Sequence, residues 1–157
     1  MRQPRTGVSM DIGDVLERVG LRAHQALYEG TGGRIGHRTI LVPTLLLTTT
    51  GRRSGRDRTV ALAYARDGDD LVVVASNHGG DTDPAWLHNI RSNPAVRIQV
   101  GRDRRDSRAR IVGPGDPGRE RLWALVDANN HGRYTGYQAR TSRPIPLVVL
   151  TLESPPV

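Results

Sequence analysis

The chain of 157 residues contains no cysteine, no phenylalanine and no lysine, and aromatic residues make up only 4% of it. The absence of cysteine excludes disulfides, thiolate metal ligands and thiol nucleophiles. No apolar run is long enough to span a bilayer, and residues 1–9 lack the apolar stretch of a signal peptide. We therefore predict a cytoplasmic protein whose core rests on aliphatic side chains, with Trp86 and Trp123 as its large aromatic fillers.

All 23 basic residues are arginine, and the formal net charge is +7. A GC-rich coding bias accounts for arginine in place of lysine, but the positive balance still favours an anionic partner, which guanidinium groups bind in a two-pronged way. Few aromatic residues and no strongly basic helix argue against nucleic acid. The densest basic run, 102–110, is diluted by Asp103 and Asp106 and is typical of a solvated hairpin. A small polyanion is the favoured partner, and peripheral contact with an acidic membrane stays open.

Strand signals dominate the chain. Runs of apolar and β-branched residues between turn residues predict seven short, mostly antiparallel strands. They cover 38–42, 45–50, 60–66, 71–76, 96–100, 107–112 and 145–152. Asp67-Gly68 predicts the turn of one hairpin, and residues 101–106 connect the strands of another. The expected fold class is mainly β with flanking helices (α+β), a barrel in a single domain over residues 1–157.

Three helices are predicted around these strands. Apolar side chains recur at helical spacing over residues 11–29, which favours an amphipathic helix that covers one end of the barrel, forms a lid or touches a membrane. The ten residues before it are expected to be flexible. Asp83-Pro84 and Asp116-Pro117 each combine a capping residue with proline, so we expect helices that run from there to about residues 93 and 128.

Two segments carry side chains suited to binding an anion or a ring. The strand connection 48–58 combines two glycines with four arginines and Ser54, which is typical either of an anion site built on backbone N–H groups or of a solvated hairpin tip. Ser76 and Asn77 end a strand with small polar side chains, which suits contact with a planar ring as well as an ordinary surface loop.

Two further segments carry aromatic residues near hydrogen-bonding groups. Trp86 and Asn89 share one helix face, either as part of a site or as a core residue and a helix-terminal hydrogen bonder. Tyr134 and Tyr137 are three positions apart in a polar segment. A phenol can donate a hydrogen bond to an oxygen on which negative charge develops, although both rings could instead pack over the barrel.

These segments, in this order, resemble the deazaflavin-dependent nitroreductase and quinone-reductase family of actinobacteria. The resemblance runs from about residue 35 to the C-terminus. It is carried by Leu45-Leu46-Leu47-Thr48-Thr49-Thr50-Gly51-Arg52-Arg53-Ser54-Gly55, Arg58, Val74-Ala75-Ser76, Gly79-Gly80, Pro84-Ala85-Trp86, His88-Asn89, Asn93-Pro94, Tyr134, Tyr137-Gln138, Arg140-Thr141 and Ile145-Pro146. It implies a split β-barrel of the flavin-reductase type, coenzyme F420, and hydride transfer to a quinone, an enone, a nitroaromatic compound or an intermediate of secondary metabolism.

The resemblance also implies roles for particular residues. The coenzyme phosphate would be held by Arg52, Arg53, Ser54 and Gly55, and Arg58 would reach a phosphate, the glutamate tail or a ring oxygen. The deazaflavin would be lined by Ala61, Ser76 and Asn77, with Trp86 packed near it, and Asn89 would also belong to the coenzyme site. The acceptor would be faced by Ala63, His131, Tyr134 and Tyr137, with the two tyrosines as catalytic hydrogen-bond donors.

Three positions depart from the family pattern. Asn77 stands where many members have lysine, which would weaken contact with the anionic part of the coenzyme. Ala63 replaces a bulky aromatic residue of some members and would widen the acceptor pocket, and His131 lies near a position where another tyrosine occurs. These departures affect the choice of acceptor more than the choice of coenzyme.

Other functions are compatible with parts of the pattern. A split barrel could instead bind FMN, or act without redox chemistry as an isomerase or a carrier. A metal hydrolase finds little support, because the five histidines are scattered without a His-Glu-x-x-His pattern and no Gly-x-Ser-x-Gly elbow occurs. We therefore predict no metal site. The sequence leaves a monomer and a homodimer equally open.

Overall fold

The structure is a computed structural model and describes residues 42–154. The predicted helix at 11–29 and most of the predicted strand at 38–42 lie outside these residues. The described elements are β1 (Thr44–Thr50), β2 (Asp57–Ala63), β3 (Ala65–Asp67), β4 (Asp70–Val74), the short 3-10 helix η1 (Asn77–Gly79), α2 (Ala85–Ser92), β5 (Ala95–Val100), β6 (Asp103–Val112), α3 (Arg119–Asn129), α4 (Arg133–Gln138) and β7 (Leu147–Leu152). Whether the single domain extends over the whole chain stays a prediction.

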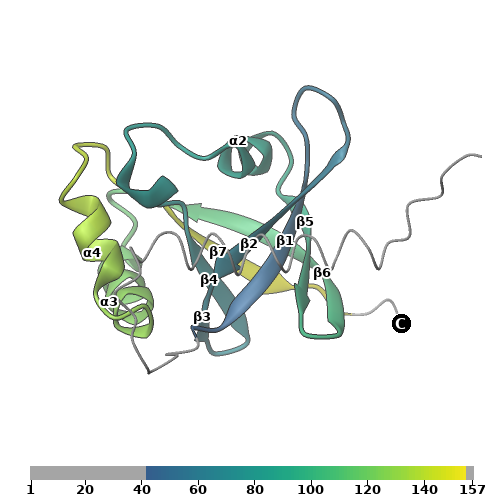
Figure 1. Cartoon of the computed structure of the whole chain (residues 1–157). Coiled ribbons are helices and arrows are strands. Elements are labelled where there is room, and N and C mark those ends of the chain that lie inside the picture. The colour runs from purple at the N-terminus through teal and green to yellow at the C-terminus, as the bar shows by residue number, and fades with distance from the viewer. Residues whose placement is uncertain (1–41, 155–157) are drawn as a thin grey trace, which may run out of the picture. The chain divides into compact units, whose positions relative to one another are not determined.

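The seven described strands form one antiparallel sheet in the order β2-β1-β5-β6-β7-β4-β3. β2 and β3 lie at opposite ends of this order, although only Tyr64 separates them in the chain. The sheet must therefore curl until its two ends approach each other, and β2 indeed contacts β4. The Tyr64 N–H donates to the carbonyl oxygen of Pro43 at this corner (3.0 Å). Figure 1 shows the curled sheet with α2 across one end and α3 and α4 together at its side.

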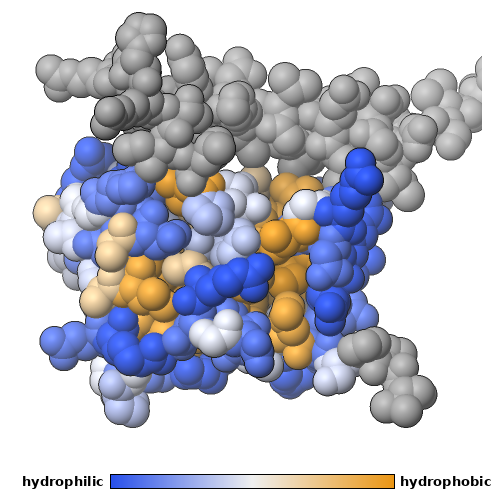
Figure 2. Space-filling model, turned by 90° about the horizontal axis from the view of Figure 1, so that it is seen from below, coloured by the Kyte–Doolittle hydropathy of each residue, from blue (hydrophilic) through white to orange (hydrophobic). Residues whose placement is uncertain are grey.

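The core has two parts because the central strands are buried on both faces. Along β4, Leu71 and Val73 belong to the cluster inside the curl, whereas Val72 and Val74 belong to the cluster that α3 and α4 cover. A strand that is buried on both faces is apolar without alternation, as this one is. Each such side chain contributes about 1.5–3 kcal/mol when buried. The curl still leaves Val60, Leu62, Val100, Ile111 and Leu152 only partly buried, and Figure 2 shows apolar patches bordered by hydrophilic residues on one face.

Two strand predictions were wrong in their extent. The run 60–66 forms two strands that begin earlier, at Asp57, because the chain turns the corner of the curl at Tyr64. The predicted turn 101–106 is shorter, since Asp103 already pairs with Val100 and only Gly101 and Arg102 form the turn. The charged residues in 103–106 favoured a loop, but the strands of a solvent-exposed hairpin also accommodate charged side chains.

The helix starts also differ from the prediction. Asp83 does not cap α2, because its carboxylate pairs with two arginines instead. At the next helix the side chain of Asp116 accepts a hydrogen bond from the Gly118 N–H (2.9 Å), and this turn delays the start of α3 to Arg119. α4 was not predicted. Within residues 42–154 we find no helix of the length and hydropathy needed to cross a bilayer.

Candidate functional site

The turn between β1 and β2 is fixed by its own backbone. The Gly51 N–H donates to the carbonyl of Arg56 (2.7 Å), and the Gly55 N–H donates to the carbonyl of Gly51 (2.8 Å). A Cβ atom on Gly51 would lie 2.8 Å from the Ser54 hydroxyl oxygen and 3.1 Å from the Arg56 carbonyl oxygen, and Gly55 has a φ of 67°. Both positions therefore favour glycine, the first for space and the second for conformation.

A cavity of about 590 Å³ lies between this turn and α2. Six of the residues predicted to bind the coenzyme line it, namely Arg52, Arg53, Ser54, Arg58, Trp86 and Asn89. Its other lining residues are Gly51, Thr59, Val60, Asp83, Ala85 and His88. Residues from two segments distant in the sequence thus enclose one space, and three of them carry guanidinium groups. The volume suits a small-molecule ligand.

Asn89 connects the helix to the turn. Its side-chain oxygen accepts a hydrogen bond from the Arg52 N–H (3.1 Å), and its side-chain nitrogen donates to the Thr49 hydroxyl oxygen (3.1 Å). Asn89 is only 6% exposed, so these bonds satisfy groups that water cannot reach. Trp86 belongs to the inner core and also lines the cavity. Trp86 is therefore a core residue that also borders the cavity, and its part in a binding site stays a prediction.

Ala61 and Ala63 are not among the cavity's lining residues. They alternate along β2 with Val60 and Leu62, which pack against the inner core, so their side chains face the outer side of the sheet. Arg58 shares the inner face with Val60. Among the residues of β2, Arg58, Thr59 and Val60 line the cavity.

Ser76 and Asn77 follow the end of β4 and lead into η1, and they are not among the described residues that line the cavity. Asn77 and His78 have positive φ angles of 44° and 54°, a conformation that costs most residues about 1–2 kcal/mol each. The Asn77 side chain supports its own loop by donating to the carbonyl of Thr82 (2.9 Å). This strained loop is therefore held in place by specific contacts.

α4 packs against η1 and brings Tyr137 next to His78. Their rings meet edge to face with centroids 5.9 Å apart, and the Tyr134 ring lies 6.3 Å from that of Tyr137. The guanidinium of Arg140 lies over the Tyr137 ring at 5.5 Å. Tyr137 is half-buried, so its phenol borders both the core and the surface. This cluster is distinct from the residues that line the cavity.

The other residues predicted to face the acceptor lie in different surroundings. Tyr134 is 7% exposed and belongs to the core under α3 and α4. Burial, with a smaller effect of the neighbouring Tyr137, raises the pKa of Tyr134 to about 12. His131 is exposed in the turn between α3 and α4, with a φ of 57°. The structure thus brings Tyr134 and Tyr137 together and leaves Tyr137 the more exposed of the two.

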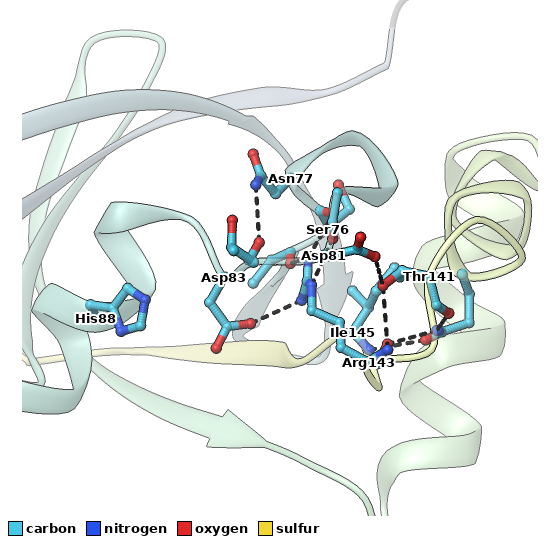
Figure 3. Close-up of polar contacts among 12 residues, drawn as sticks. Ser76, Asn77, Asp81, Asp83, His88, Thr141, Arg143 and Ile145 are labelled. Carbon is cyan, nitrogen blue, oxygen red and sulfur yellow. Dashed lines mark hydrogen bonds and ion pairs between the residues drawn. The ribbon is translucent and has the colours of Figure 1, made fainter.

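Three polar residues near the site were missed by the sequence analysis. Arg143 lies between the loop after β4 and the segment before β7, where Figure 3 shows it among Ser76, Asp83 and Thr141. Asp83 and His88 line the cavity. Nothing in the sequence distinguishes Arg143 from the other 22 arginines, because its burial depends on contacts across 60 or more positions. No group of three histidine, aspartate or glutamate side chains within 42–154 is placed to hold a metal ion.

Comparisons with known proteins identify relatives of this chain. The model of the family described as F420H(2)-dependent quinone reductase matches residues 20–152. An F420H(2)-dependent quinone reductase of Mycobacterium tuberculosis is 54% identical over 147 residues, which cover 90% of this chain and 99% of that protein. The solved F420-H2 dependent reductase FDR-A has a TM-score of 0.63 at 33% identity, and the match covers 73% of this chain and 99% of its own.

Two other solved structures extend the comparison. One, described as a domain-swapped dimer, has a TM-score of 0.63 at 30% identity and covers 87% of this chain and 98% of its own. HutZ of Vibrio cholerae, a heme storage protein, has a TM-score of 0.58 at 17% identity over 85% of this chain and 92% of its own, so it shares the fold alone. The common fold is the split β-barrel of the flavin-reductase type, as the sequence predicted.

Proposed function

The chain belongs to the F420H(2)-dependent quinone reductase family, and on that premise we propose where its coenzyme and its acceptor bind. The protein is an oxidoreductase that uses F420 and transfers hydride to a quinone-type acceptor. F420 is a deazaflavin with a phosphodiester and a glutamate tail, so a site for it needs both positive charge and a wall for a ring.

The cavity between the β1–β2 turn and α2 fits the anionic part of that coenzyme. Arg52, Arg53 and Arg58 bring three guanidinium groups to one space, and this observation carries the proposal. The Ser54 hydroxyl oxygen accepts from the Arg56 N–H (3.2 Å), which leaves its proton available to a phosphate oxygen. Gly55 fixes the turn by its φ of 67° and needs no contact of its own.

The ring system needs a wall and polar groups beyond the arginines. Trp86 lines the cavity. Asn89 bonds the turn to α2, the helix that carries Trp86. Ser76 and Asn77 would border the far end of the deazaflavin, since the loop that they begin runs on to Asp83 in the cavity wall. Ala61 and Ala63 contact a ligand only if it also reaches the outer face of β2.

The acceptor side is served best by Tyr137. The bound coenzyme supplies the hydride, and the chain supplies position and hydrogen bonds. The Tyr137 phenol can donate to an acceptor oxygen as negative charge develops on it. Tyr134 supports that ring from the core, and as a whole residue it is only 7% exposed. We place exposed His131 at the rim of the acceptor side, where it has no defined role.

Association and location are further proposals. A homodimer is the favoured assembly, because one relative at 30% identity is a domain-swapped dimer, and light scattering of the purified protein measures this directly. Cytoplasmic location and peripheral membrane contact stay predictions. Neither FMN nor nucleic acid is favoured by a contact in the described part of the chain.

Titration with oxidised F420, followed by its fluorescence and run in parallel with FMN, tests the proposed site. We expect saturable binding that Arg53→Ala weakens at least tenfold. Arg102→Ala is the matched control, because Arg102 is exposed at the tip of the β5–β6 hairpin, and it should bind like the wild type. Equal losses in both variants would show that net charge alone matters. Binding of FMN but not of F420 would contradict the proposal.

A further inference from the structure

Arg143 is an almost enclosed cation next to the candidate site. Its side chain is 14% exposed, and it donates to four acceptors on one loop. These are the carbonyl oxygens of Ala75 (3.2 Å), Ser76 (2.9 Å) and Gly80 (2.8 Å) and the carboxylate of Asp83 (2.9 Å). Figure 3 shows this side chain pointing into the loop from the segment that precedes β7. A single residue thus holds both ends of the loop that leads from β4 to α2.

Asp83 has a second cationic partner. Its other carboxylate oxygen lies 2.8 Å from Arg91, in the last turn of α2. The Asp83 side chain is 20% exposed and lines the cavity, where it is the one acidic residue among the twelve residues within 42–154 that line it. Two guanidinium groups therefore face a carboxylate in the wall of a cavity that otherwise displays positive charge.

An unpaired carboxylate in that wall would oppose an anionic ligand. Like charges repel more strongly beside a protein wall than in open water, because the effective dielectric constant is lower there. Pairing with Arg143 and Arg91 offsets this repulsion, so among the described residues that line the cavity the guanidinium groups of Arg52, Arg53 and Arg58 dominate the charge. The pairing also explains why Asp83 is turned away from the start of α2, which has no side-chain cap.

We propose that Arg143 is a positioning residue of the coenzyme site, which acts by neutralising Asp83 and not by touching the coenzyme. This inference rests on the proposed function. It assigns two separate effects to one side chain. The charge of Arg143 governs affinity for the anionic ligand, whereas its several hydrogen bonds govern the stability of the loop 75–83.

Four variants separate these effects: Arg143→Met, Arg143→Lys, Asp83→Asn and the double variant Arg143→Met/Asp83→Asn. For each we would measure the Kd for oxidised F420 by fluorescence, the Tm, and kcat and KM with F420H2 and a soluble benzoquinone. Arg121→Ala is the control, because Arg121 makes a two-pronged ion pair with Asp67 away from the cavity (2.7 and 2.8 Å).

We expect Arg143→Met to raise the Kd about tenfold or more, since it leaves the Asp83 carboxylate with one partner fewer. The double variant should return to within about threefold of Asp83→Asn. Arg143→Lys should have a lower Tm than the wild type but a Kd within about threefold of it. Lysine keeps the positive charge but lacks the planar guanidinium group that makes several hydrogen bonds at once. The loss of affinity in Arg143→Met should appear as a higher KM for the coenzyme, with kcat unchanged.

Other outcomes would overturn the inference. A double variant as weak as Arg143→Met would mean that Asp83 does not mediate the effect, and an unchanged Kd in folded Arg143→Met would reduce Arg143 to a structural role. If Arg143→Met does not fold, the Kd of Arg143→Lys tests the inference. This variant keeps the positive charge, so a tenfold loss of affinity in it would contradict the proposed role of charge. If the wild type itself does not bind F420, the proposed function fails, and the inference fails with it.

Discussion

The side-chain amide of Asn89 holds the backbone of Arg52, 37 positions earlier in the chain, at 3.1 Å. This bond joins α2 to the arginine-bearing turn, the two walls of the cavity. The turn itself makes hydrogen bonds only over short distances, from Gly51 to Arg56 and from Gly55 to Gly51. Asn89 therefore sets where the turn's charges lie relative to Trp86.

Asn89→Ala should weaken both the fold and the site. The substitution leaves the Thr49 hydroxyl and the Arg52 N–H without their partner, which costs about 1–3 kcal/mol of unfolding free energy. The freed turn must then be ordered on binding, so the Kd for F420 should rise roughly threefold to tenfold. Urea unfolding and fluorescence titration measure the two effects separately.

The control for that variant is Asn129→Ala. Asn129 also donates from a partly buried amide, to the carbonyl of Tyr64 (2.9 Å), but it lies outside the cavity. It should lose a similar amount of stability and keep the wild-type Kd. A comparable rise of Kd in both variants would show that stability in general, and not the bond to Arg52, sets the affinity.

Gly55→Ala and Gly101→Ala form a second matched pair. Both glycines have positive φ angles, 67° and 58°, and a Cβ atom added to either would meet no other atom within 4 Å. Each alanine should therefore cost about 1 kcal/mol of unfolding free energy through backbone strain alone. Only Gly55→Ala should also raise the Kd for F420, because relief of its strain displaces Arg53 and Ser54. An unchanged Kd in Gly55→Ala would show that the conformation of the turn at residue 55 does not affect F420 binding.

Much of the fold follows from local pattern. Alternation and turn residues located all the described strands except the separate β3, and the resemblance supplied the way in which they close into a split barrel. The corner at Tyr64 could not be foreseen, since a run such as 57–67 is typical of one strand whether or not the sheet curls. The starts of α2 and α3 were also misplaced, because Asp83 and Asp116 have partners that only the folded chain brings near.

Sequence patterns predicted the part of the candidate site that lies in one continuous segment. They did not reveal the part that forms only when distant segments pack together. The β1–β2 turn is a continuous segment, so its arginines and glycines stand together in the sequence. Asp83 and Arg143 are 60 positions apart and meet only through the packing of two loops. Tyr134 and Tyr137 looked equivalent as two tyrosines three positions apart, and only the structure shows that one is core and the other borders the surface.

Tyr137→Phe and Tyr134→Phe should differ in turnover. Removal of the Tyr137 hydroxyl takes away the proposed donor to the acceptor oxygen, and kcat with a quinone should fall about 10²-fold. Tyr134→Phe should change kcat by less than about threefold, because Tyr134 is mostly buried in the core under α3 and α4. Both variants should bind F420 like the wild type. If neither variant loses activity, the proposed catalytic role of the tyrosines is wrong.

The stabilities of the two variants should also depend differently on pH in alkaline solution. The Tyr134 phenol has a pKa of about 12 in the folded chain, above its ordinary value of 10.0, chiefly because burial disfavours the charged form. Between these values the unfolded chain has lost the phenolic proton and the folded chain keeps it. The unfolded state then binds fewer protons, so stability falls as the pH rises through this range.

Urea unfolding of the wild type and Tyr134→Phe between pH 9 and pH 12 measures this dependence. The substitution itself shifts stability by an amount that does not vary with pH, so the slope is the informative quantity. The wild type should lose on the order of 2 kcal/mol more than Tyr134→Phe over this range. Tyr137→Phe keeps the buried phenol but loses the smaller contribution of Tyr137 to its pKa, so its curve should lie closer to that of the wild type than to that of Tyr134→Phe. Parallel curves for the wild type and Tyr134→Phe would mean that the Tyr134 hydroxyl is open to water, and Tyr134 would then regain its place as a candidate donor to the acceptor.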